Sequence, residues 1–299
     1  MLTDIARRLG RSSGLKPLRA LLDELFAAAR RPTVTYVGNN RVLVGTKVGD
    51  RTIAYYVEAD DRLLSPGFIV TGRFETQLTN YFLRHLRPDS HCIDAGSNFG
   101  YYSCLMARYC PEGRVIGVEA DRHIADLARD NLFINNLHGT ADIVHAAVSD
   151  RDAPVTLYRR AFRSGNTSIV NVGDNFTTAL AEPPAEPFTV PGIRIDDLAG
   201  RMEGKVDFIK IDVEGAEPRA LAGARETIQC NRDLSIVMEW SPGQISAAGF
   251  DLRQFMSDIA ALGLRCFALE RHGEHPIETG ALAAMPYQTG IVLRRWDAC

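Results

Sequence analysis

Residues 94–100 combine an acid, two glycines and an asparagine in the order Asp94-Ala-Gly96-Ser-Asn98-Phe-Gly100. The apolar stretch before them predicts a strand, and the residues after Gly100 predict a helix. Gly96 permits a tight turn, and Asn98 tolerates the left-handed backbone that glycine would otherwise supply. The first N–H groups of a helix have no partner within it and can bind a ligand. Because Asp94 would repel a pyrophosphate, the turn favours a ligand with a cationic amino group.

A second acid, Glu119, ends the next apolar stretch, residues 114–119. An acid at the tip of the second strand can accept hydrogen bonds from both hydroxyls of a ribose. The two acids together predict a nucleoside cofactor with a cationic amino group, such as S-adenosylmethionine. A dinucleotide-binding turn would read G-x-G-x-x-G, and residues 94–100 do not. The alternative for Asp94 is that it only caps the turn.

Other residues on the same edge of the predicted sheet complete this candidate cofactor site. Ala120 and Asp121 lie where an adenine edge would lie, and Ala147 and Val148 end the third apolar stretch on the same rim. The predicted cofactor-binding residues are Asp94, Gly96, Ser97, Asn98, Phe99, Gly100, Glu119, Ala120, Asp121, Ala147 and Val148.

Charged residues interrupt the fourth apolar stretch, which reads DFIKIDVEGAE over residues 207–217. In a parallel α/β sheet, ligands bind at the carboxyl ends of the strands. We therefore predict that Lys210, Asp212 and Glu214 face a ligand, the alternative being a satisfied internal ion pair. Glu217 is explained by the favourable position of an acid in the first turn of a helix.

The elements that must position these residues alternate between strand and helix patterns from residue 90 onward. Two further strands, around 264–269 and 287–295, have no helical stretch between them and are expected to be antiparallel neighbours. Alternating strands and helices indicate a parallel sheet with helices on both faces, so the fold class is α/β. The five preceding apolar stretches that predict strands are 91–94, 114–119, 141–148, 206–211 and 234–240.

The first 70 residues have a different character. Leucine and phenylalanine recur at helical spacing over residues 17–30, which predicts an amphipathic helix. It either packs on its own domain or forms a membrane-surface or dimerisation helix. Residues 33–70 carry apolar runs separated by glycine and asparagine turns, which predict a small antiparallel meander. We divide the chain into this appendage, 1–70, and one domain, 71–299.

Two segments of that domain do not follow the alternation of strand and helix patterns. Residues 71–88 predict a helix that ends before Pro88. Residues 159–191 are rich in glycine, proline, asparagine and threonine, and a long irregular stretch inside a compact domain is usually functional. We expect this stretch, together with the meander, to cover a substrate pocket.

Composition excludes several classes of protein. The chain has 299 residues and a net charge of −3, which gives no support to non-specific nucleic-acid binding. We find no apolar run long enough for a transmembrane helix, and the charges among residues 1–31 argue against a secretory signal. Six scattered cysteines without a C-x-x-C pair indicate buried thiols in a reducing cytoplasm. The scarcity of lysine suggests a GC-rich bacterial genome.

The combination of DAGSNFGYYS, GVEA, HAAVSD, IRIDDL and DFIKIDVEGAE resembles the FkbM family of class I S-adenosylmethionine-dependent methyltransferases. The resemblance covers roughly residues 70–295. It implies a seven-stranded Rossmann-like sheet whose last strand is antiparallel. It also implies O-methylation of a hydroxyl on a sugar, polyketide or other secondary metabolite, so the partner is a small-molecule or glycan acceptor. Ser97 departs from the alanine common in the family.

The resemblance also suggests roles for the block after the fourth strand. Asp212 or Glu214 would be the general base toward the acceptor hydroxyl. Lys210 would hold that carboxylate or stabilise the developing alkoxide. Some class I O-methyltransferases hold a divalent metal at the tips that Asp212 and Glu239 occupy here; Mg²⁺ would suit such oxygen ligands, but we predict no metal.

Two other functions stay open at this point. A nicotinamide-dependent oxidoreductase would share the sheet and Glu119, but it should show G-x-G-x-x-G. A non-catalytic binding protein could keep the fold, although the intact acids argue against it. His145, in the third apolar stretch, is interpreted as a core residue rather than a catalyst.

Overall fold

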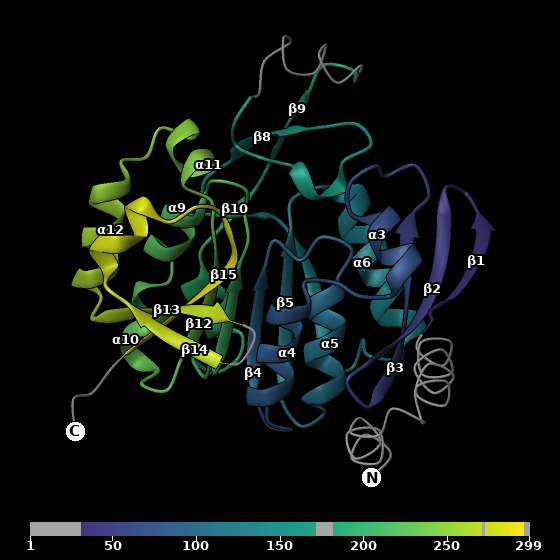
Figure 1. The fold of residues 1–299 in the computed structure, drawn as a ribbon, viewed down its shortest axis with the longest axis horizontal. Coiled ribbons are helices and arrows are strands. Elements are labelled where there is room, and N and C mark those ends of the chain that lie inside the picture. Colours follow the sequence, from purple (N-terminus) through teal and green to yellow (C-terminus); the bar gives the residue numbers. More distant parts are fainter. Residues whose placement is uncertain (1–30, 172–181, 271–272, 296–299) are drawn as a thin grey trace, which may run out of the picture.

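The computed structural model describes residues 31–171, 182–270 and 273–295 (Figure 1). Its centre is an eight-stranded sheet with the order β14-β13-β15-β12-β11-β4-β5-β6. Pairing is parallel from β6 to β12 and antiparallel from β12 to β14. The strands of this sheet are β4 (His91–Ala95), β5 (Arg114–Glu119), β6 (Ala141–His145), β11 (Phe208–Ile211), β12 (Ser235–Trp240), β13 (Leu264–Glu270), β14 (Gly273–Ile277) and β15 (Gln288–Arg295).

The central strands are buried along their whole length. Every residue of β11 and β12 is buried, and so is nearly all of β4 and β5. Parallel strands covered by helices on both faces need such continuous apolar sequences. These strands can therefore be recognised from the sequence. The buried charged residues are exceptions to this apolar pattern: Asp94 and Lys210 lie beside each other in register on β4 and β11, and Glu119 and Glu239 lie near the ends of β5 and β12.

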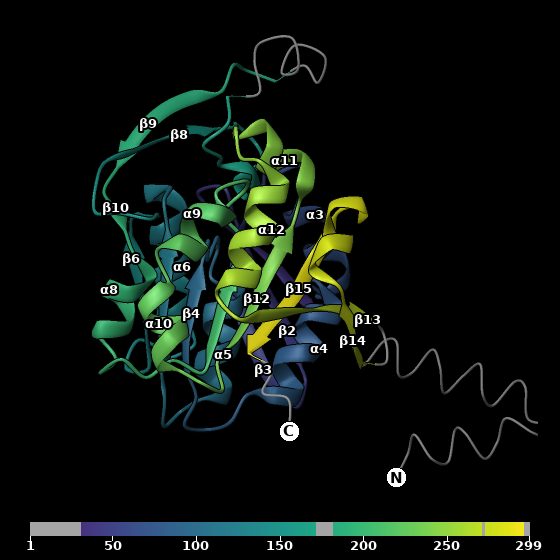
Figure 2. The same ribbon diagram turned by 90° about the vertical axis from the view of Figure 1, so that its left-hand side faces the viewer.

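Helices cover both faces of the sheet (Figures 1 and 2). On one face, α4, α5 and α6 form a hydrophobic core with the meander outside them. On the other face, α8 to α12 form a second core. The helices are α3 (Ser65–Thr71), α4 (Thr76–His85), α5 (Tyr101–Tyr109), α6 (Arg122–Ile134), α8 (Ile195–Gly200), α9 (Glu217–Ala222), α10 (Arg225–Cys230), α11 (Pro242–Ala247) and α12 (Leu252–Ala261), with short 3-10 turns at Ser164–Asn166 and Thr279–Ala284. In the part of the chain described here, no helix is both long and apolar enough to cross a membrane.

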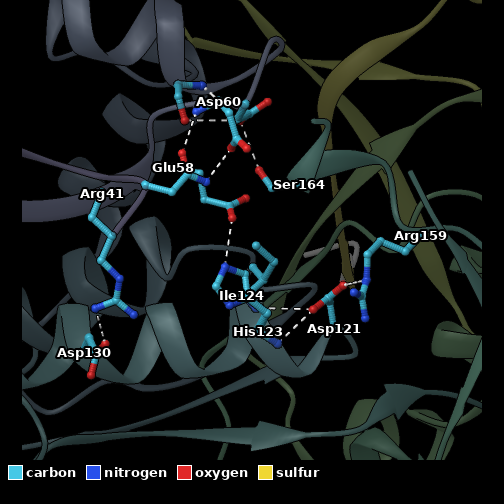
Figure 3. Close-up of polar contacts among 12 residues, drawn as sticks. Arg41, Glu58, Asp60, Asp121, His123, Ile124, Asp130, Arg159 and Ser164 are labelled. Carbon is cyan, nitrogen blue, oxygen red and sulfur yellow. Dashed lines mark hydrogen bonds and ion pairs between the residues drawn. The ribbon is translucent and has the colours of Figure 1, made fainter. Parts of the chain in front are cut away.

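The predicted antiparallel meander is present as β1 (Thr33–Gly38), β2 (Arg41–Val48) and β3 (Arg51–Glu58). Ion pairs tie it to α6: Arg41 contacts Asp130 at 2.6 Å, and Glu58 contacts His123 at 2.9 Å (Figure 3). Its inward side chains belong to the same hydrophobic core as α5 and α6. The division at residue 70 stays a prediction.

Two side-chain amides of α6 complete this attachment. Asn131 accepts the N–H of Tyr56 at 2.6 Å and donates to the Tyr56 carbonyl at 2.9 Å. Asn135 bonds both backbone groups of Ala54 in the same way, at 3.0 and 2.6 Å. Side-chain amides of α6 therefore form hydrogen bonds with the free edge of β3, where a further strand would otherwise pair.

The structure corrects several expectations. The sheet has eight strands rather than seven, because residues 273–277 fold back on β13 as an additional edge strand. The strand expected over 141–148 ends at His145, and β7 (Ala147–Val148) pairs with β10 (Gly192–Ile193) in a separate small sheet. The helix expected over 71–88 starts at Thr76 because Gly72, at φ +62°, ends α3 first.

The segment 159–191 is less irregular than expected. Its β9 (Glu186–Val190) pairs antiparallel with β8 (Val155–Arg159), and both lie over one end of the main sheet (Figure 1). The last two strands, β13 and β15, are antiparallel neighbours as predicted. The helix expected over 17–30 lies outside the described residues.

Candidate functional site

The turn after β4 requires its small residues. A Cβ on Gly96 would lie 1.7 Å from the carbonyl oxygen of Asp212, and the residue has φ +78°. Asn98 and Gly100 also have positive φ, at 49° and 81°. A Cβ on Gly100 would press on Ala128 of α6 at 3.1 Å. The turn is therefore packed against the β11 loop on one side and α6 on the other.

Glu119 lies at the tip of β5, directly against this turn. Its two carboxylate oxygens accept the N–H groups of Asn98 and Asp121, at 2.9 and 2.8 Å. Burial raises the pKa of Glu119 to about 7, although these N–H donors oppose the rise. Each oxygen accepts one bond here and has capacity for another, so Glu119 can receive two hydroxyl donors.

A cavity opens beside Glu119, and we call it the alanine-lined cavity. Small apolar side chains cover much of its wall, and Asp212, Glu214 and Arg219 supply charge at its rim. Six of the predicted cofactor residues line it: Gly96, Asn98, Glu119, Ala120, Ala147 and Val148.

A second cavity adjoins the first, and we call it the acidic cavity. Four carboxylates line it together with aromatic and amide side chains: Glu75, Asp212, Glu214, Glu239, Tyr102, Tyr287, Gln244 and Asn166. The wall between the two cavities is shared, because the same residues line both: Gly96, Asn98, Gly165, Asp212 and Glu214.

Lys210 links the two strands that carry the acids. Its Nζ lies 3.1 Å from Asp212 Oδ2, 3.7 Å from Asp94 Oδ1 and 3.2 Å from the carbonyl of Gly96. Burial lowers the pKa of Lys210, but Asp212 and Asp94 outweigh burial and hold the pKa above its usual value. An ammonium has three N–H donors, and three protein acceptors surround this one. The arrangement favours the role of holding Asp212 over that of stabilising an alkoxide.

Asp94 supports the turn from behind. It is fully buried and accepts a hydrogen bond from Ser103 at 2.6 Å. Asp94, Gly100 and Asp121 line neither of the two cavities. Asp121 instead caps α6 and forms an ion pair with Arg159 at 2.5 Å (Figure 3). Ser97 and Phe99 line the acidic cavity rather than the alanine-lined one.

Three glutamates of the acidic cavity are held mainly in the uncharged form. Burial, reinforced by the charge of Asp212, raises the pKa of Glu75 to about 7, of Glu214 to about 8 and of Glu239 to about 10. Tyr102 donates to Glu75 at 2.7 Å, and Gln244 donates to Glu214. Such shifts mark a cluster of acids in a space that excludes water.

Sequence reasoning did not single out Glu75, Tyr102, Gln244 or Tyr287. Glu75 precedes α4 with φ 36°, and only the fold brings it to the β11 loop. Tyr287 precedes β15, the strand inserted between β12 and β13. A left-handed glutamate before a helix leaves no signature in the sequence, so no local pattern could have found it.

The segment 159–191 contributes to both cavities through its described part. Ser164, Gly165, Thr167 and Ile169 line the alanine-lined cavity, and Gly165 lines the acidic cavity too. Ser164 donates to Asp61 at 3.1 Å, which ties this segment to the start of α3. We expected the segment 159–191 and the meander to cover a substrate pocket. The segment lines both cavities, and Leu63 and Leu64, which follow the meander, line the acidic one, whereas the meander strands line neither.

His145 and the suggested metal ligands have ordinary surroundings. His145 Nε2 contacts the carbonyl of Ala120 at 3.0 Å, and the ring lines neither cavity. Among the described residues, no three histidine, cysteine or acidic side chains are grouped to hold a metal ion. Lys210 engages Oδ2 of Asp212 at 3.1 Å, so this oxygen is occupied by an ammonium.

Comparison with curated proteins finds methyltransferases. The chain is 25% identical to "Methyltransferase 1" of Beauveria bassiana over 146 residues, which span 45% of this chain and 58% of that protein. It is 24% identical to "Methyltransferase sdnD" of Sordaria araneosa over 187 residues, 55% of this chain and 72% of that one. The chain thus spans less than two thirds of the first of these relatives.

Solved structures with a similar fold include several methyltransferases. One is a methyltransferase FkbM from Methylobacillus flagellatus, with 15% identity, a TM-score of 0.40 and coverage of 69% of this chain and 44% of that one. Another is an O-methyltransferase from Bacillus cereus in complex with SAH, with 15% identity, a TM-score of 0.42 and coverage of 78% and 86%.

The family comparison covers the motifs described above with a single match. The sequence profile described as "Methyltransferase FkbM domain" matches residues 94–266. The match begins at the acid of the β4 turn, ends inside β13 and contains the β11 block, so it covers more than half of the chain. The chain therefore belongs to the FkbM methyltransferase family.

Proposed function

We propose that this protein is an S-adenosylmethionine-dependent O-methyltransferase acting on a small-molecule or glycan acceptor. The observation that carries the proposal is the pair of adjoining cavities whose shared wall holds Asp212 and Glu214. One cavity fits the cofactor, the other the acceptor, and the acids stand between them. Family membership favours this function over a nicotinamide-dependent oxidoreductase or a non-catalytic binding protein.

The alanine-lined cavity fits the nucleoside half of the cofactor. Glu119 would accept the ribose hydroxyls with the lone pairs that Asn98 and Asp121 leave free. Ala120 and Ala147 leave room for a flat base. The backbone of Gly96 lines this cavity, and the turn needs glycine there because a Cβ would meet the carbonyl oxygen of Asp212. The amino-acid end would lie toward Ser97, whose hydroxyl has no hydrogen-bond partner within the described residues.

When bound, the cofactor supplies an electrophilic methyl group on a sulfonium. The task of the protein is to hold an acceptor oxygen beside it in line and to remove the proton of the hydroxyl. Asp212 is the proposed base, since Lys210 fixes its Oδ2 and leaves Oδ1 for the acceptor. Asp94 acts through Lys210 and Ser103 and is a positioning residue.

Calorimetry with S-adenosylmethionine, S-adenosylhomocysteine and NADH tests the cofactor. We expect both adenosyl compounds to bind and Glu119→Ala to weaken them at least about tenfold, which is about 1.4 kcal/mol. Tighter binding of NADH than of S-adenosylmethionine would contradict the proposal. Transfer of labelled methyl into a fractionated extract, with mass spectrometry of the product, then identifies the acceptor.

The division of the chain into domains, its assembly, its location and its source are also proposals. We propose that residues 71–299 form the methyltransferase domain and that residues 1–70 are an appendage to it. Dimerisation through the helix expected over 17–30, a cytoplasmic location and a bacterial source remain predictions.

A further inference from the structure

The acidic cavity gathers more acids than the protein balances with cations, and burial favours the protonated form of the acids left without one. Its lining includes the carboxylates of Glu75, Asp212, Glu214 and Glu239. Among the described residues that line it, Lys210 is the one cation, and it also lies 3.7 Å from the buried Asp94. Carboxylates removed from water without a partner are costly to keep. The cavity therefore has the character of a site for a positive ligand.

Three buried polar atoms on its wall have no partner within the described residues: Oε1 of the half-buried Gln244, and two atoms on residues that are more than nine-tenths buried. One is Oε2 of Glu239, a residue with 8% of its surface exposed. The other is the hydroxyl of Ser97, a residue with 4% of its surface exposed. Buried polar atoms in proteins are nearly always hydrogen-bonded, so these two indicate a missing ligand. They lie on the two sides of the cavity: Ser97 in the proposed cofactor turn, and Glu239 at the end of β12.

The proposed cofactor balances only part of this charge. Its ammonium and carboxylate cancel each other, so only the sulfonium adds a net positive charge. Lys210 and the sulfonium together can balance two of the four acids in their ionised form. The other two stay protonated unless a further cation enters, and one of them, Glu239 with its unpartnered oxygen, ends β12, which lies two strands away from β4 and the cofactor turn.

We infer that the acceptor carries a protonated amine close to the hydroxyl that is methylated, and that Glu239, with Glu75 and Glu214 around the cavity, receives this amine. The inference rests on the proposed function and narrows its substrate class to amino alcohols, amino sugars included. A neutral polyol could bond the same oxygens but would bring no charge to favour the ionised form of these acids.

The register of β11 and β12 sets the spacing between the hydroxyl and the amine of the methyl acceptor. Ile211 of β11 pairs with Met238 of β12, so the following residues, Asp212 and Glu239, stand side by side at the strand tips. Neighbouring strands are about 4.8 Å apart. A hydroxyl at Asp212 and an ammonium at Glu239 therefore belong to atoms only a few bonds apart on one molecule.

An organic amine fits this cavity better than a metal ion does. No three acids among the described residues are grouped as metal ligands. The wall also presents the rings of Tyr102 and Tyr287, and Tyr102 already faces one ammonium, Lys210 Nζ, at 5.3 Å from its centroid. Aromatic faces attract organic cations.

A matched pair of small probes tests the inference on the full chain loaded with S-adenosylhomocysteine. The probes are protonated trans-2-aminocyclohexanol and the neutral trans-cyclohexane-1,2-diol, which differ in one group. By calorimetry at low salt, we expect the aminoalcohol to bind at least about tenfold more tightly than the diol. Glu239→Gln and, independently, Glu75→Gln should each reduce this preference, whereas the exposed Glu112→Gln should leave it unchanged.

The outcomes separate this inference from the proposed function. Binding of S-adenosylhomocysteine is measured first, and its failure would overturn the cofactor proposal. If the loaded chain binds the diol as tightly as the aminoalcohol, or binds neither, the amine site is wrong while the cofactor site stands. A preference that survives in both glutamine variants would also overturn the assignment to these carboxylates.

Discussion

Lys210 is a cation placed by strand register rather than by a loop. Because Lys210 and Asp94 are register partners on neighbouring parallel strands, their side chains share one face of the sheet. The ammonium then reaches Asp212, two residues further along the chain and just past the end of β11. The proposed base is thus held by a residue of a buried strand, which suits a group that must meet an acceptor oxygen in a fixed geometry.

Removing Lys210 should affect folding as well as chemistry. Lys210→Met leaves Asp94 and Asp212 without their cation, and breaking a buried pair in this way typically costs about 3–5 kcal/mol. Urea unfolding followed by fluorescence measures the loss. Lys210→Met combined with Asp94→Asn should recover part of it, since one orphaned charge is removed. An unchanged midpoint for Lys210→Met alone would show that the ion pair contributes nothing.

Asp212→Asn should separate chemistry from cofactor binding. The substitution is nearly isosteric but removes the basic oxygen, and loss of a general base typically lowers turnover by about 10²–10⁴-fold. Affinity for S-adenosylhomocysteine should stay close to that of the wild type, and the exposed Asp233→Asn serves as control. A variant that keeps its turnover at saturating cofactor but binds S-adenosylhomocysteine much more weakly would place Asp212 in the cofactor half of the site instead.

Chelator provides a further check on Asp212. Since Lys210 engages this carboxylate, methyl transfer should be unaffected by EDTA and by added Mg²⁺. Activity that disappears with chelator, and that Glu239→Gln also abolishes, would instead make the two acids metal ligands.

At the level of elements, the loop between β11 and α9 depends on Glu217. This buried carboxylate accepts the N–H groups of Val213 and Gly215, at 3.1 and 3.3 Å. Glu214 and Gly215 both have positive φ, so the loop is strained and needs such a support. The acid interpreted from sequence as a helix-dipole residue is therefore the anchor of the loop that presents Glu214.

Glu217 also makes stability depend on pH. Burial raises its pKa from 4.5 to about 7, so the folded state holds its proton more tightly than the unfolded state does. The resulting stabilisation is full below pH 4.5 and is lost as pH rises through 7. Between about pH 5 and pH 8, the free energy of unfolding of the wild type should fall relative to that of Glu217→Gln by up to about 3 kcal/mol. Denaturant titrations across this range measure it, with Glu112→Gln as control; parallel pH profiles would contradict it.

The elements that the sequence predicts best are those whose burial is uniform. β4, β5, β11 and β12 show as apolar runs because helices cover both faces. The added strand β14 was missed because its residues, GEHPI, are only partly buried and owe their pairing to β13. Glu119, Asp212 and Glu214 follow strands and were found, whereas Glu75 and Tyr287 reach the cavity only through tertiary packing.

At the scale of the whole molecule, the meander and the methyltransferase fold share one core. Tyr55 of β3 stacks on Tyr101 of α5 at 5.2 Å and packs edge-on against Phe99 of the cofactor turn at 5.9 Å. Asn131 of α6 bonds β3 and also donates to the carbonyl of Phe99 at 2.8 Å. The meander thus stands directly behind the turn that we assign to the cofactor.

Asn131→Ala should loosen that attachment. It leaves the N–H and carbonyl of Tyr56 and the carbonyl of Phe99 without their partner, and each unsatisfied buried group costs about 1–3 kcal/mol. We expect a loss of unfolding free energy of about 2–4 kcal/mol together with weaker binding of S-adenosylhomocysteine. The exposed Asn80→Ala on α4 is the matched control. Unchanged stability in Asn131→Ala would show that the amide contacts are dispensable.

The shared wall between the two cavities has a thermodynamic consequence. A ligand that orders Asn98, Gly165 and Asp212 from one side prepares the same residues for a ligand on the other side. Such coupling is reciprocal. If bound cofactor product raises the affinity for an acceptor by some factor, bound acceptor must raise the affinity for the cofactor product by the same factor. The two substrates should therefore load cooperatively, and the wall itself would set their linkage free energy.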